Sequence, residues 1–321
     1  MEILKVAVLR GGISSEREVS LKTGAGILAA LHKLGHTVID VDFKGDIQLL
    51  VATLKENKPD VVFNALHGIW GEDGCIQGLL ELLGIPYTHS GVTASAIAMD
   101  KEATRQLCTT KGIDVALGFV CTQANLTNPL PKGLSFPVVV KPVAEGSSVG
   151  VTIVRTQEDF AKAAQTAKDN IPLLVEEYIP GREFTVPVLE QDFLPRPLPV
   201  IEIVPKAEST FYDYASKYQD DVHADFIVPA AIPAALTARI QEAALAVHTA
   251  LGCRGVTRSD FRYDPKKNRL IFLEINTQPG MTSLSLVPAS AKADGLTYQE
   301  VVAHVLAARH LRPRTTVGEV H

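Results

Sequence analysis

The sequence predicts a protein of mixed α/β and α+β class, in which an N-terminal domain with a parallel β-sheet precedes two smaller mixed units. Three observations lead to this prediction. Strand-like apolar segments alternate with helical patterns through residues 1–98, which is typical of a parallel sheet covered by helices. Beyond residue 99, strand-like segments follow one another with fewer helices between them. The chain has 321 residues, which is too long for one small core.

The first 98 residues contain three short apolar segments that we expect to be strands. They are residues 4–9, 37–43 and 60–66. A helix is predicted after the first strand, because Ser15 and Glu18 have the spacing of a capping box and Gly35 is a typical stop. Residues 75–83 predict a second helix. Because the loops after parallel strands meet at one edge of the sheet, we expect a ligand at that edge.

Residues 99–182 read as a compact α+β unit. Helices are predicted over 99–112 and 156–168, and the proline-rich residues 122–135 predict a surface loop. The expected strands are residues 137–141, 150–155 and 173–178.

Residues 183–321 form the third part. The expected strands are residues 183–189, 200–204, 255–263 and 269–276. A long polar and aromatic loop is predicted over 206–225 and a helix over 234–251. Two short helices close the chain, and a tail follows residue 312.

Composition and charge exclude several classes of protein. Hydrophobic residues make up 46% of the chain and charged residues 21%, as in soluble globular proteins. The 31 Lys and Arg against 36 Asp and Glu give a net charge of −5, without the basic excess of a nucleic-acid-binding protein. No apolar run approaches the ~18 residues of a membrane span, and the N-terminus has no signal-peptide pattern. The four cysteines lie far apart, so we expect reduced thiols in the cytoplasm.

A candidate phosphate-binding loop occupies residues 141–150. A predicted strand ends in Lys141, and Gly146 and Gly150 allow the backbone to approach a ligand closely. The serine hydroxyls and free N–H groups of such a loop can bind phosphate oxygens, and Lys141 adds a positive charge. The segment lacks the Gly-Lys-Ser/Thr of a Walker loop. The alternative interpretation is an ordinary hairpin turn.

A candidate metal site lies on two strands that we expect to be neighbours. Arg258 and Asp260 share one face of the first strand, and Glu274 and Asn276 share one face of the second, because alternate residues of a strand point the same way. If the strands pair through residues 264–268, the two carboxylates and the amide lie together. Such oxygen ligands suit Mg²⁺. The alternative is a solvated sheet face, although adjacent carboxylates repel each other without a cation.

Three further segments are candidate parts of a ligand site. Residues 16–20 place Glu16 at a helix start, where a carboxylate also has the ordinary use of favouring the helix dipole. Residues 67–74 combine His67, three glycines and two acids at the expected ligand edge, and a structural role for the histidine is equally open. Residues 210–218 suit a lid that folds over a site, or an ordinary surface loop.

Taken in order, these segments resemble the D-alanine–D-alanine ligases of the ATP-grasp superfamily. The resemblance extends from residue 11 to about residue 288. It rests on Gly-Gly-x-Ser-x-Glu-Arg-Glu-Val-Ser from residue 11, His-Gly-x-x-Gly-Glu-Asp-Gly from 67, Met-Asp-Lys from 99, Lys-Pro-x-x-Glu-Gly-Ser-Ser-Val-Gly from 141, Phe-Tyr-Asp-Tyr…Lys-Tyr from 211, and Glu-x-Asn-Thr-x-Pro-Gly-Met-Thr from 274. It implies a Rossmann-like domain at 1–98, followed by the two parts of an ATP-grasp fold at 99–182 and 183–321, with a lid loop near 206–225.

The resemblance implies an ATP-dependent ligase that joins two D-alanines into D-alanyl-D-alanine for peptidoglycan precursor synthesis. One carboxylate is phosphorylated to an acyl phosphate, and the amine of the second D-alanine attacks it. The implied ligands are ATP, two molecules of D-alanine and two Mg²⁺ or Mn²⁺ ions. Neither nucleic acid nor membrane is expected as a partner, and the family suggests a homodimer.

Roles on the nucleotide side also follow from the resemblance. Residues that match ATP-binding positions are Lys101, Lys141, Glu176, Glu183 and Lys217. The lysines correspond to groups that hold the phosphates, Glu176 to the contact with the adenine amino group, and Glu183 to the ribose-binding carboxylate. The residues that match the magnesium ligands are Asp260, Glu274 and Asn276.

On the substrate side, five residues match catalytic positions: Glu16, Ser147, Tyr218, Arg258 and Ser285. Glu16 resembles the carboxylate that receives the ammonium of the first D-alanine, and Ser147 and Tyr218 the pair that hydrogen-bonds with it and closes the lid. Arg258 resembles the guanidinium that stabilises the oxyanion. The second D-alanine is expected to contact Ser285 through its carboxylate. A histidine near the acceptor amine corresponds to His67.

Few positions depart from the family pattern. The lid has Ala215 and Ser216 where an acid is more usual, which bears on how the lid closes and leaves its Lys-Tyr pair intact. Gln278 and Leu284 occupy positions that vary in the family.

Two alternative functions are compatible with most of these residues. The first is a depsipeptide ligase that accepts D-lactate, against which Tyr218 argues, because the D-lactate enzymes of the family differ at this lid position. The second is a catalytically silent nucleotide-binding scaffold. Such a protein is expected to lack Arg258 or one of the metal ligands, whereas this sequence retains Arg258 and all the matched metal-ligand positions.

Overall fold

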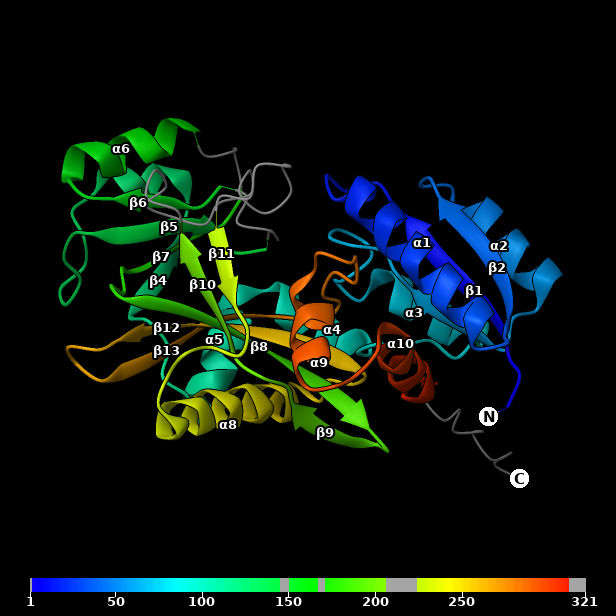
Figure 1. Ribbon diagram of the computed structural model, residues 1–321. Helices are drawn as coiled ribbons and strands as arrows, with labels where there is room; N and C mark the ends of the chain where they lie inside the picture. The colour runs from blue at the N-terminus through cyan, green and yellow to red at the C-terminus, as the bar shows by residue number, and fades with distance from the viewer. Residues whose placement is uncertain (1, 145–149, 167–170, 206–223, 312–321) are drawn as a thin grey trace, which may run out of the picture.

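The computed structural model describes residues 2–144, 150–166, 171–205 and 224–311 (Figure 1). Three β-sheets organise this part of the chain: one in the N-terminal region, one between residues 118 and 177, and one between residues 182 and 276. The N-terminal sheet lies to one side of the molecule, and the other two lie together on the opposite side. The domain limits at 98/99 and 182/183 stay predictions.

The N-terminal sheet is parallel, as predicted. Its strands are β1 (Lys5–Gly11), β2 (Thr37–Phe43) and β3 (Val61–Asn64), in the order β2-β1-β3. Val6 and Val8 of β1 pack on one face against helix α1 (Arg17–Lys33). Leu9 points to the other face, because side chains alternate along a strand, and α2 (Ile47–Asn57) and α3 (Cys75–Leu83) cover it. The sheet therefore has helices on both faces.

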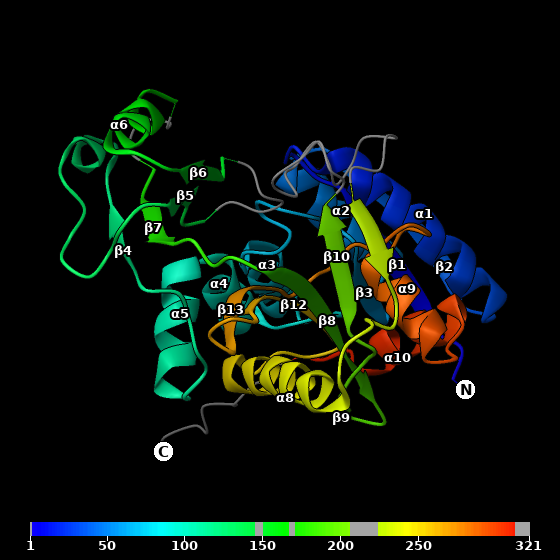
Figure 2. The same ribbon diagram turned by 60° about the vertical axis from the view of Figure 1, so that its left-hand side comes forward.

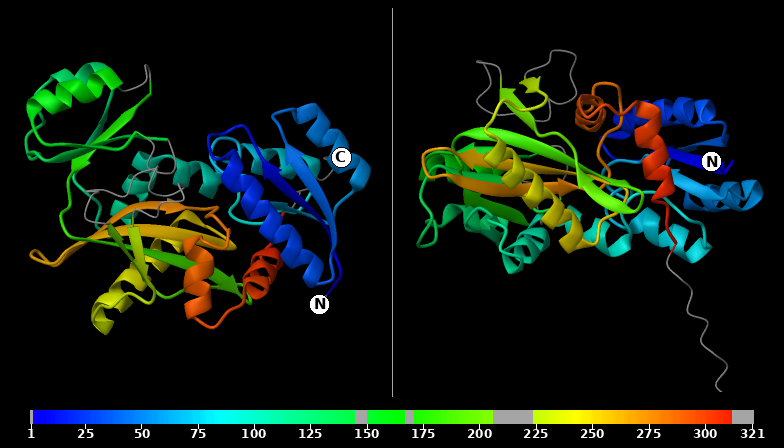
Figure 3. Two further views of the ribbon diagram at one scale, coloured as in Figure 1. Left: turned by 45° about the horizontal axis from the view of Figure 1, so that its top comes forward. Right: turned by 60° about the horizontal axis from the view of Figure 1, so that its bottom comes forward.

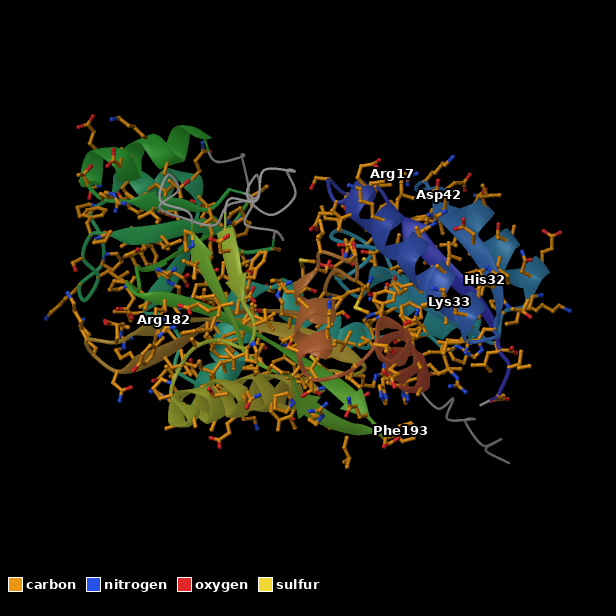
Figure 4. All side chains as sticks on the ribbon, viewed as in Figure 1. Arg17, His32, Lys33, Asp42, Arg182 and Phe193 are labelled. Atoms are coloured by element: carbon orange, nitrogen blue, oxygen red, sulfur yellow. The ribbon has the colours of Figure 1, made fainter. Side chains whose placement is uncertain are left out.

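The start of α1 differs from the prediction. The predicted capping box is wrong, because the N-cap residue is Glu16 and its side chain makes no capping hydrogen bond. Tertiary contacts hold the turn instead. The Ser14 hydroxyl accepts from the Glu16 N–H at 3.2 Å and donates to the His67 carbonyl at 2.7 Å. Arg17 donates to both carboxylate oxygens of Asp42 in β2, at 2.8 and 2.9 Å (Figure 4).

The helix predicted over residues 99–112 is the second of two. They are α4 (Val92–Met99) and α5 (Lys101–Thr110). Asp100 lies between them with an extended backbone, and its carboxylate accepts from the N–H groups of Glu102 and Ala103 at 3.0 and 2.9 Å. This is an N-cap, and it makes Lys101 the first residue of α5. Neither α2 nor α4 is among the elements that the sequence predicted.

The central sheet is antiparallel. Its strands are β4 (Gly118–Cys121), β5 (Val138–Pro142), β6 (Thr152–Val154) and β7 (Leu173–Glu177), in the order β4-β7-β5-β6. Helix α6 (Gln157–Thr166) and the 3-10 helix η1 (Gln123–Thr127) pack beside it, with Phe160 in the shared core. The three predicted strands of this unit are confirmed, and β4 is an addition to them.

The C-terminal sheet is the largest. Its strands are β8 (Arg182–Gln191), β9 (Leu194–Pro197), β10 (Ile201–Pro205), β11 (Ala224–Ile227), β12 (Val256–Asp264) and β13 (Arg269–Asn276). They run antiparallel in the order β11-β10-β8-β12-β13, and β9 pairs with β8. Helix α8 (Ala234–Leu251) has both predicted limits. Its Ile240 shares a core with Phe184, Phe272 and, from α4 and α5, Ala98 and Cys108.

The end of the chain returns to the N-terminal unit. The two short helices predicted there are α9 (Leu286–Ala293) and α10 (Tyr298–Ala307). Val301 and Val305 of α10 lie in one core with Ile27 and Leu31 of α1, and Val256 of β12 joins the same core. Figures 2 and 3 show α10 beside α1. The N-terminal sheet and the C-terminal sheet are thus packed together. Within the described ranges, no helix has the length and apolarity that crossing a bilayer requires.

His248 makes the stability of this fold depend on pH. The residue is 1% exposed on α8, and its Nδ1 lies 2.8 Å from the hydroxyl of Thr257 in β12. Burial lowers the pKa of His248 to about 4, whereas an unfolded histidine titrates near 6.5. Between these values the unfolded chain binds the proton more readily. The contribution to stability is therefore full above about pH 6.5 and is lost as the pH falls toward 4.

When the pH falls from 7 to 5, the free energy of unfolding should decrease both in the unmodified protein and in His248→Asn. We expect the decrease to be about 2 kcal/mol smaller in His248→Asn. Asparagine keeps a polar group near the position of Nδ1 and does not titrate in this range. Urea unfolding at both pH values measures the difference. The control is His32→Asn, which changes an exposed histidine of α1 (Figure 4) and is expected to keep the original pH dependence. An equal loss in His248→Asn and the unmodified protein would contradict the lowered pKa.

Candidate active site

A large cleft brings together most of the predicted site residues. Its volume is about 1620 Å³, and it is lined by α1, the loop after β3, strands β12 and β13 and the segment 280–299. The predicted residues that line it are Glu16, His67, Lys101, Glu183, Arg258, Asp260, Glu274, Asn276 and Ser285. Lys141 and Glu176 are not part of its lining. Ser147, Lys217 and Tyr218 lie outside the described residues.

Strands β12 and β13 pair in the way that the metal-site hypothesis requires. In their antiparallel ladder Arg258 lies opposite Asn276, and Asp260 lies opposite Glu274. All four side chains line the cleft. Directly opposed residues have Cβ atoms only about 4.5–5.5 Å apart, so the two carboxylates lie close to each other.

A β-bulge turns Glu274 to the cleft. The register of the ladder shifts after Asp260, so Phe261 pairs with Phe272 and Leu273 is an extra residue of β13. Phe261 and Phe272 lie in the core on the other side of the sheet. In a strand without the bulge, Glu274 would share the face of Phe272 and would enter that core. The bulge is therefore required for a carboxylate pair on one face.

Positive groups accompany both carboxylates. Arg258 donates from Nε and Nη2 to the two oxygens of Asp260, each at 3.0 Å, and the Thr185 hydroxyl also donates to this carboxylate. The Lys101 Nζ lies 3.5 Å from Glu274 Oε2. Burial lowers the pKa of Lys101, and the neighbouring Glu274 opposes that shift. These cations reduce the repulsion between the paired carboxylates.

The same face has the donor set of a hard cation site. Asp260, Glu274 and Asn276 present two carboxylates and one amide oxygen, and each carboxylate has more lone pairs than Arg258 and Lys101 engage. Across the described ranges, no group of three or more His, Cys, Asp or Glu could hold a metal ion. An ion at this face would therefore need further oxygens from water or phosphate. Such a site fits Mg²⁺ bound together with a nucleotide.

A second charged cluster lies on the central sheet. Lys141 at the end of β5 and Glu176 of β7 are 6% and 4% exposed, and the Lys141 Nζ lies 2.5 Å from Glu176 Oε1. The Arg105 Nε lies 3.9 Å from the other oxygen of this carboxylate. The backbone N–H of Lys101 donates to the Val143 carbonyl at 3.0 Å. This bond holds the start of α5, and with it Lys101, against the end of β5.

His67 belongs to a buried polar cluster. Its Nδ1 lies 3.1 Å from Glu72 Oε1, and its Nε2 lies 3.2 Å from the Thr23 hydroxyl. Burial acts to lower the pKa of His67, but the hydrogen bond and charge of Glu72, with the charge of Glu16, outweigh it and raise the pKa. Burial, opposed by His67 and supported by the charge of Glu16, raises the pKa of Glu72. The two acids of the segment 67–74 were a signal for Glu72, whereas no sequence signal indicated Thr23.

Two other predicted residues have well-defined partners. Ser285 is the N-cap residue of α9, and its Oγ accepts from the Thr282 N–H at 3.0 Å and lies 2.9 Å from the Thr282 hydroxyl. Glu183 of β8 accepts from Arg262 Nη1 at 3.0 Å. Arg262 was not predicted as a site residue. Its position two residues after Asp260, on the same strand face, was the available signal.

Known proteins are similar to the chain over nearly its whole length. Family models described as D-ala D-ala ligase C-terminus and D-ala D-ala ligase N-terminus match residues 118–307 and 45–90. The D-alanine–D-alanine ligase of Gluconobacter oxydans is 50% identical over 301 residues, which cover 93% of this chain and 96% of the relative. That of Acidiphilium cryptum is 48% identical over 302 residues, with the same two coverages. The chain belongs to the D-alanine–D-alanine ligase family.

Solved ligase structures share the fold. The D-alanine–D-alanine ligase from Bacillus anthracis complexed with ATP has a TM-score of 0.80 at 33% identity, over 96% of this chain and 97% of that one. The VanG D-Ala:D-Ser ligase from Enterococcus faecalis has a TM-score of 0.80 at 30% identity, over 96% and 99%. The architecture expected from the sequence, a Rossmann-like domain followed by an ATP-grasp fold, is therefore confirmed.

Proposed function

We propose that this member of the D-alanine–D-alanine ligase family joins two D-alanines to D-alanyl-D-alanine at the expense of ATP, for peptidoglycan precursor synthesis in the cytoplasm. One observation carries the proposal: a single strand pair presents a guanidinium, two carboxylates and an amide to the cleft that also contains Glu16. An acyl-phosphate ligation needs groups of these kinds, because it must hold a nucleotide with its metal, an ammonium and an oxyanion.

ATP would contact both sheets of the ATP-grasp unit. The residues proposed to bind it are Lys101, Lys141, Glu176, Glu183 and Lys217. The lysines hold the phosphates, Glu176 accepts from the adenine amino group, and Glu183 accepts from the ribose hydroxyls, since an ionised carboxylate is an acceptor only. In support, Lys101 and Lys141 are brought to one place by the bond between α5 and the end of β5. A ligase of this fold has been solved with ATP.

Asp260, Glu274 and Asn276 would hold two Mg²⁺ or Mn²⁺ ions. Bound there, such ions supply charge neutralisation to the phosphates during phosphoryl transfer. The protein's own contribution is to keep the ligands on one face. The bulge after Asp260 turns Glu274 to the cleft, and Arg258 fixes the Asp260 carboxylate with two hydrogen bonds.

In the first step, a D-alanine carboxylate is activated. Glu16 receives the ammonium of this D-alanine and orients its carboxylate toward ATP. A carboxylate oxygen then forms a bond to the γ-phosphorus while the bond from that phosphorus to the bridging oxygen of ADP breaks. The products are ADP and an acyl phosphate. Lys101 and Lys141 hold the phosphate charge during the transfer.

In the second step, the free amine of the other D-alanine attacks the acyl carbon. This attack forms the C–N bond, and Arg258 donates to the oxyanion of the tetrahedral intermediate. Collapse of the intermediate breaks the bond from the carbon to the phosphate oxygen, and the departing phosphate takes the proton that the amine loses. Ser285 holds the carboxylate of this D-alanine. His67, fixed by Glu72 and Thr23, lies beside its amine. Ser147 and Tyr218 would close the lid loop near 206–225 over the site by hydrogen-bonding with Glu16.

A coupled assay of ADP release with D-alanine, L-alanine, D-serine or D-lactate, with products identified by mass, tests the function. We expect ADP release to require D-alanine and the product to be D-alanyl-D-alanine. D-Lactate, added with D-alanine, is expected to give little depsipeptide, because the lid has Tyr218. ADP release without D-alanine, or none at all, would refute the proposal. The mass in solution tests the homodimer that family resemblance suggests.

Lys141 provides a test of the nucleotide site. Lys141→Met is expected to weaken ATP binding about 10- to 100-fold and adenosine binding much less, because a hydrogen bond to a charged group is worth about 1.5–3 kcal/mol. Calorimetric titration with both ligands measures this. Lys111→Met, which changes an exposed lysine at the end of α5, is the control. If ATP and adenosine binding weaken equally, Lys141 has a structural role only.

A further inference from the structure

A buried glutamine connects the two halves of the cleft. Gln278, two residues after β13, is 2% exposed, and Asn64, the last residue of β3, has no exposed surface. The Asn64 Nδ2 donates to Gln278 Oε1 at 2.8 Å, and Gln278 Nε2 donates to the Leu66 carbonyl. The side-chain amide of Gln278 therefore joins the segment after β13 to the end of the N-terminal sheet. Gln278 and Leu66 are 212 positions apart in the sequence.

Gln278 bonds both to a proposed metal ligand and to the residue that precedes His67. Its backbone N–H donates to Asn276 Oδ1, a proposed metal ligand, at 2.7 Å. On the side of the second D-alanine, its side-chain Nε2 binds the carbonyl of Leu66, the residue directly before His67. Asn64, its side-chain partner, also donates to the Gly71 carbonyl at 3.0 Å and so holds the loop that carries the histidine. The residue thus lies between the metal-binding strand and the acceptor-side loop.

Two buried hydrogen bonds fix the position of the Gln278 side chain. Both ends of the Gln278 amide are used, one as acceptor and one as donor, in a place that excludes water. Breaking either bond would leave a buried polar group without a partner, which costs more than the bond contributes. A small shift between the two loops would also move the acceptor amine relative to the acyl carbon, and attack requires an approach of about 3–3.5 Å.

We propose that Gln278 is a positioning residue that sets the acceptor-side loop of His67 against the strand carrying Asn276, and so determines how well the second D-alanine is bound. This inference rests on the proposed function. Gln278 touches neither substrate nor nucleotide in it. We therefore expect its replacement to weaken the binding of the second D-alanine and to have little effect on the binding of ATP.

The test compares two buried glutamines that bind the same loop. Gln77 of α3 is 1% exposed and donates from Nε2 to the Gly71 carbonyl at 2.8 Å, but it does not contact the C-terminal sheet through this bond. We expect Gln278→Leu to raise the KM for D-alanine about tenfold and to leave the KM for ATP within about twofold. Gln77→Leu loses a buried bond of the same kind and is expected to keep both KM values while its melting temperature falls.

A competition experiment tests the binding site of the second D-alanine separately from the ATP site. With D-alanine and D-serine present together, D-alanyl-D-alanine and D-alanyl-D-serine arise from the same acyl phosphate, so their ratio depends on the acceptor site. We expect Gln278→Leu to change this ratio about threefold or more and Gln77→Leu to keep it. Gln278→Glu, which keeps the acceptor for Asn64 and loses the donor to Leu66, is expected to change the ratio in the same direction and replaces Gln278→Leu if that variant does not fold.

A double variant tests whether the effect of Gln278 on the KM for D-alanine depends on its bond to Asn64. If it is, Asn64→Leu combined with Gln278→Leu raises the KM for D-alanine no further than the worse single variant. The inference would be overturned if Gln278→Leu and Gln77→Leu changed the KM for D-alanine and the product ratio equally. It would also be overturned if Gln278→Leu raised the KM for D-alanine and the KM for ATP by the same factor. A failure of the proposed function is distinguishable, because the unmodified protein itself would then release no ADP with D-alanine.

Discussion

Replacing Glu274 by glutamine is expected to lower kcat about 100-fold or more while the fold survives. The substitution keeps the shape of the side chain and removes its charge. Glu274 lies opposite Asp260 on the cleft face and 3.5 Å from Lys101. It is thus the proposed metal ligand that also contacts a proposed phosphate-binding lysine. Transition-state charge stabilisation by a bound metal is worth several kcal/mol, and about 2.7 kcal/mol corresponds to 100-fold.

The measurement is steady-state ADP release over a wide range of Mg²⁺ and Mn²⁺ concentrations, with circular dichroism to confirm the fold. Glu190→Gln serves as the matched control. It removes the same charge from β8 of the same sheet, where Glu190 accepts from the Gly255 N–H at 2.9 Å and is not part of the cleft lining. We expect it to keep kcat within about twofold. Near-normal turnover of Glu274→Gln at saturating Mg²⁺ would remove this residue from the metal site.

Arg258→Lys is expected to lower kcat about 100-fold, although it keeps the positive charge. Arg258 holds both oxygens of Asp260 with a planar fork, and the proposed mechanism also requires it to donate to the oxyanion. A lysine ammonium cannot make the paired bonds of a guanidinium. Removing one donor of an oxyanion site typically costs 100- to 1000-fold in kcat.

The control for Arg258 comes from the same face of the same strand. Arg262 binds Glu183, the proposed ribose-binding carboxylate, at 3.0 Å. We expect Arg262→Lys to raise the KM for ATP and to change kcat much less. Single-turnover kinetics with preformed enzyme–ATP complex separates the two effects. If both variants lose kcat equally, the assignment of Arg258 to the oxyanion is wrong.

Much of the fold follows from local patterns. The parallel N-terminal sheet, helix α8 with its two limits, and strand β13 with its two limits were all predictable, because apolar periodicity and stop residues are local properties. Helix α4 was not, since its alanine-rich residues are nearly uniform in polarity and show no distinct face. The capping box at the start of α1 was predicted wrongly, because contacts from the distant Asp42 and His67 determine that turn.

The candidate site divides in the same way. Residue types and spacing alone determined the family and which side chains are candidates, because each motif requires particular residues at fixed offsets on a strand or loop. Only the tertiary structure decided how they meet. The bulge that turns Glu274 away from the core depends on how β13 pairs with β12. The bonds of Gln278 to Asn64 and Leu66 form only when the C-terminal sheet packs against the N-terminal sheet. The contact of His67 with Thr23 forms only when α1 packs on the N-terminal sheet. Such contacts depend on the packing of whole sheets, which a local pattern does not contain.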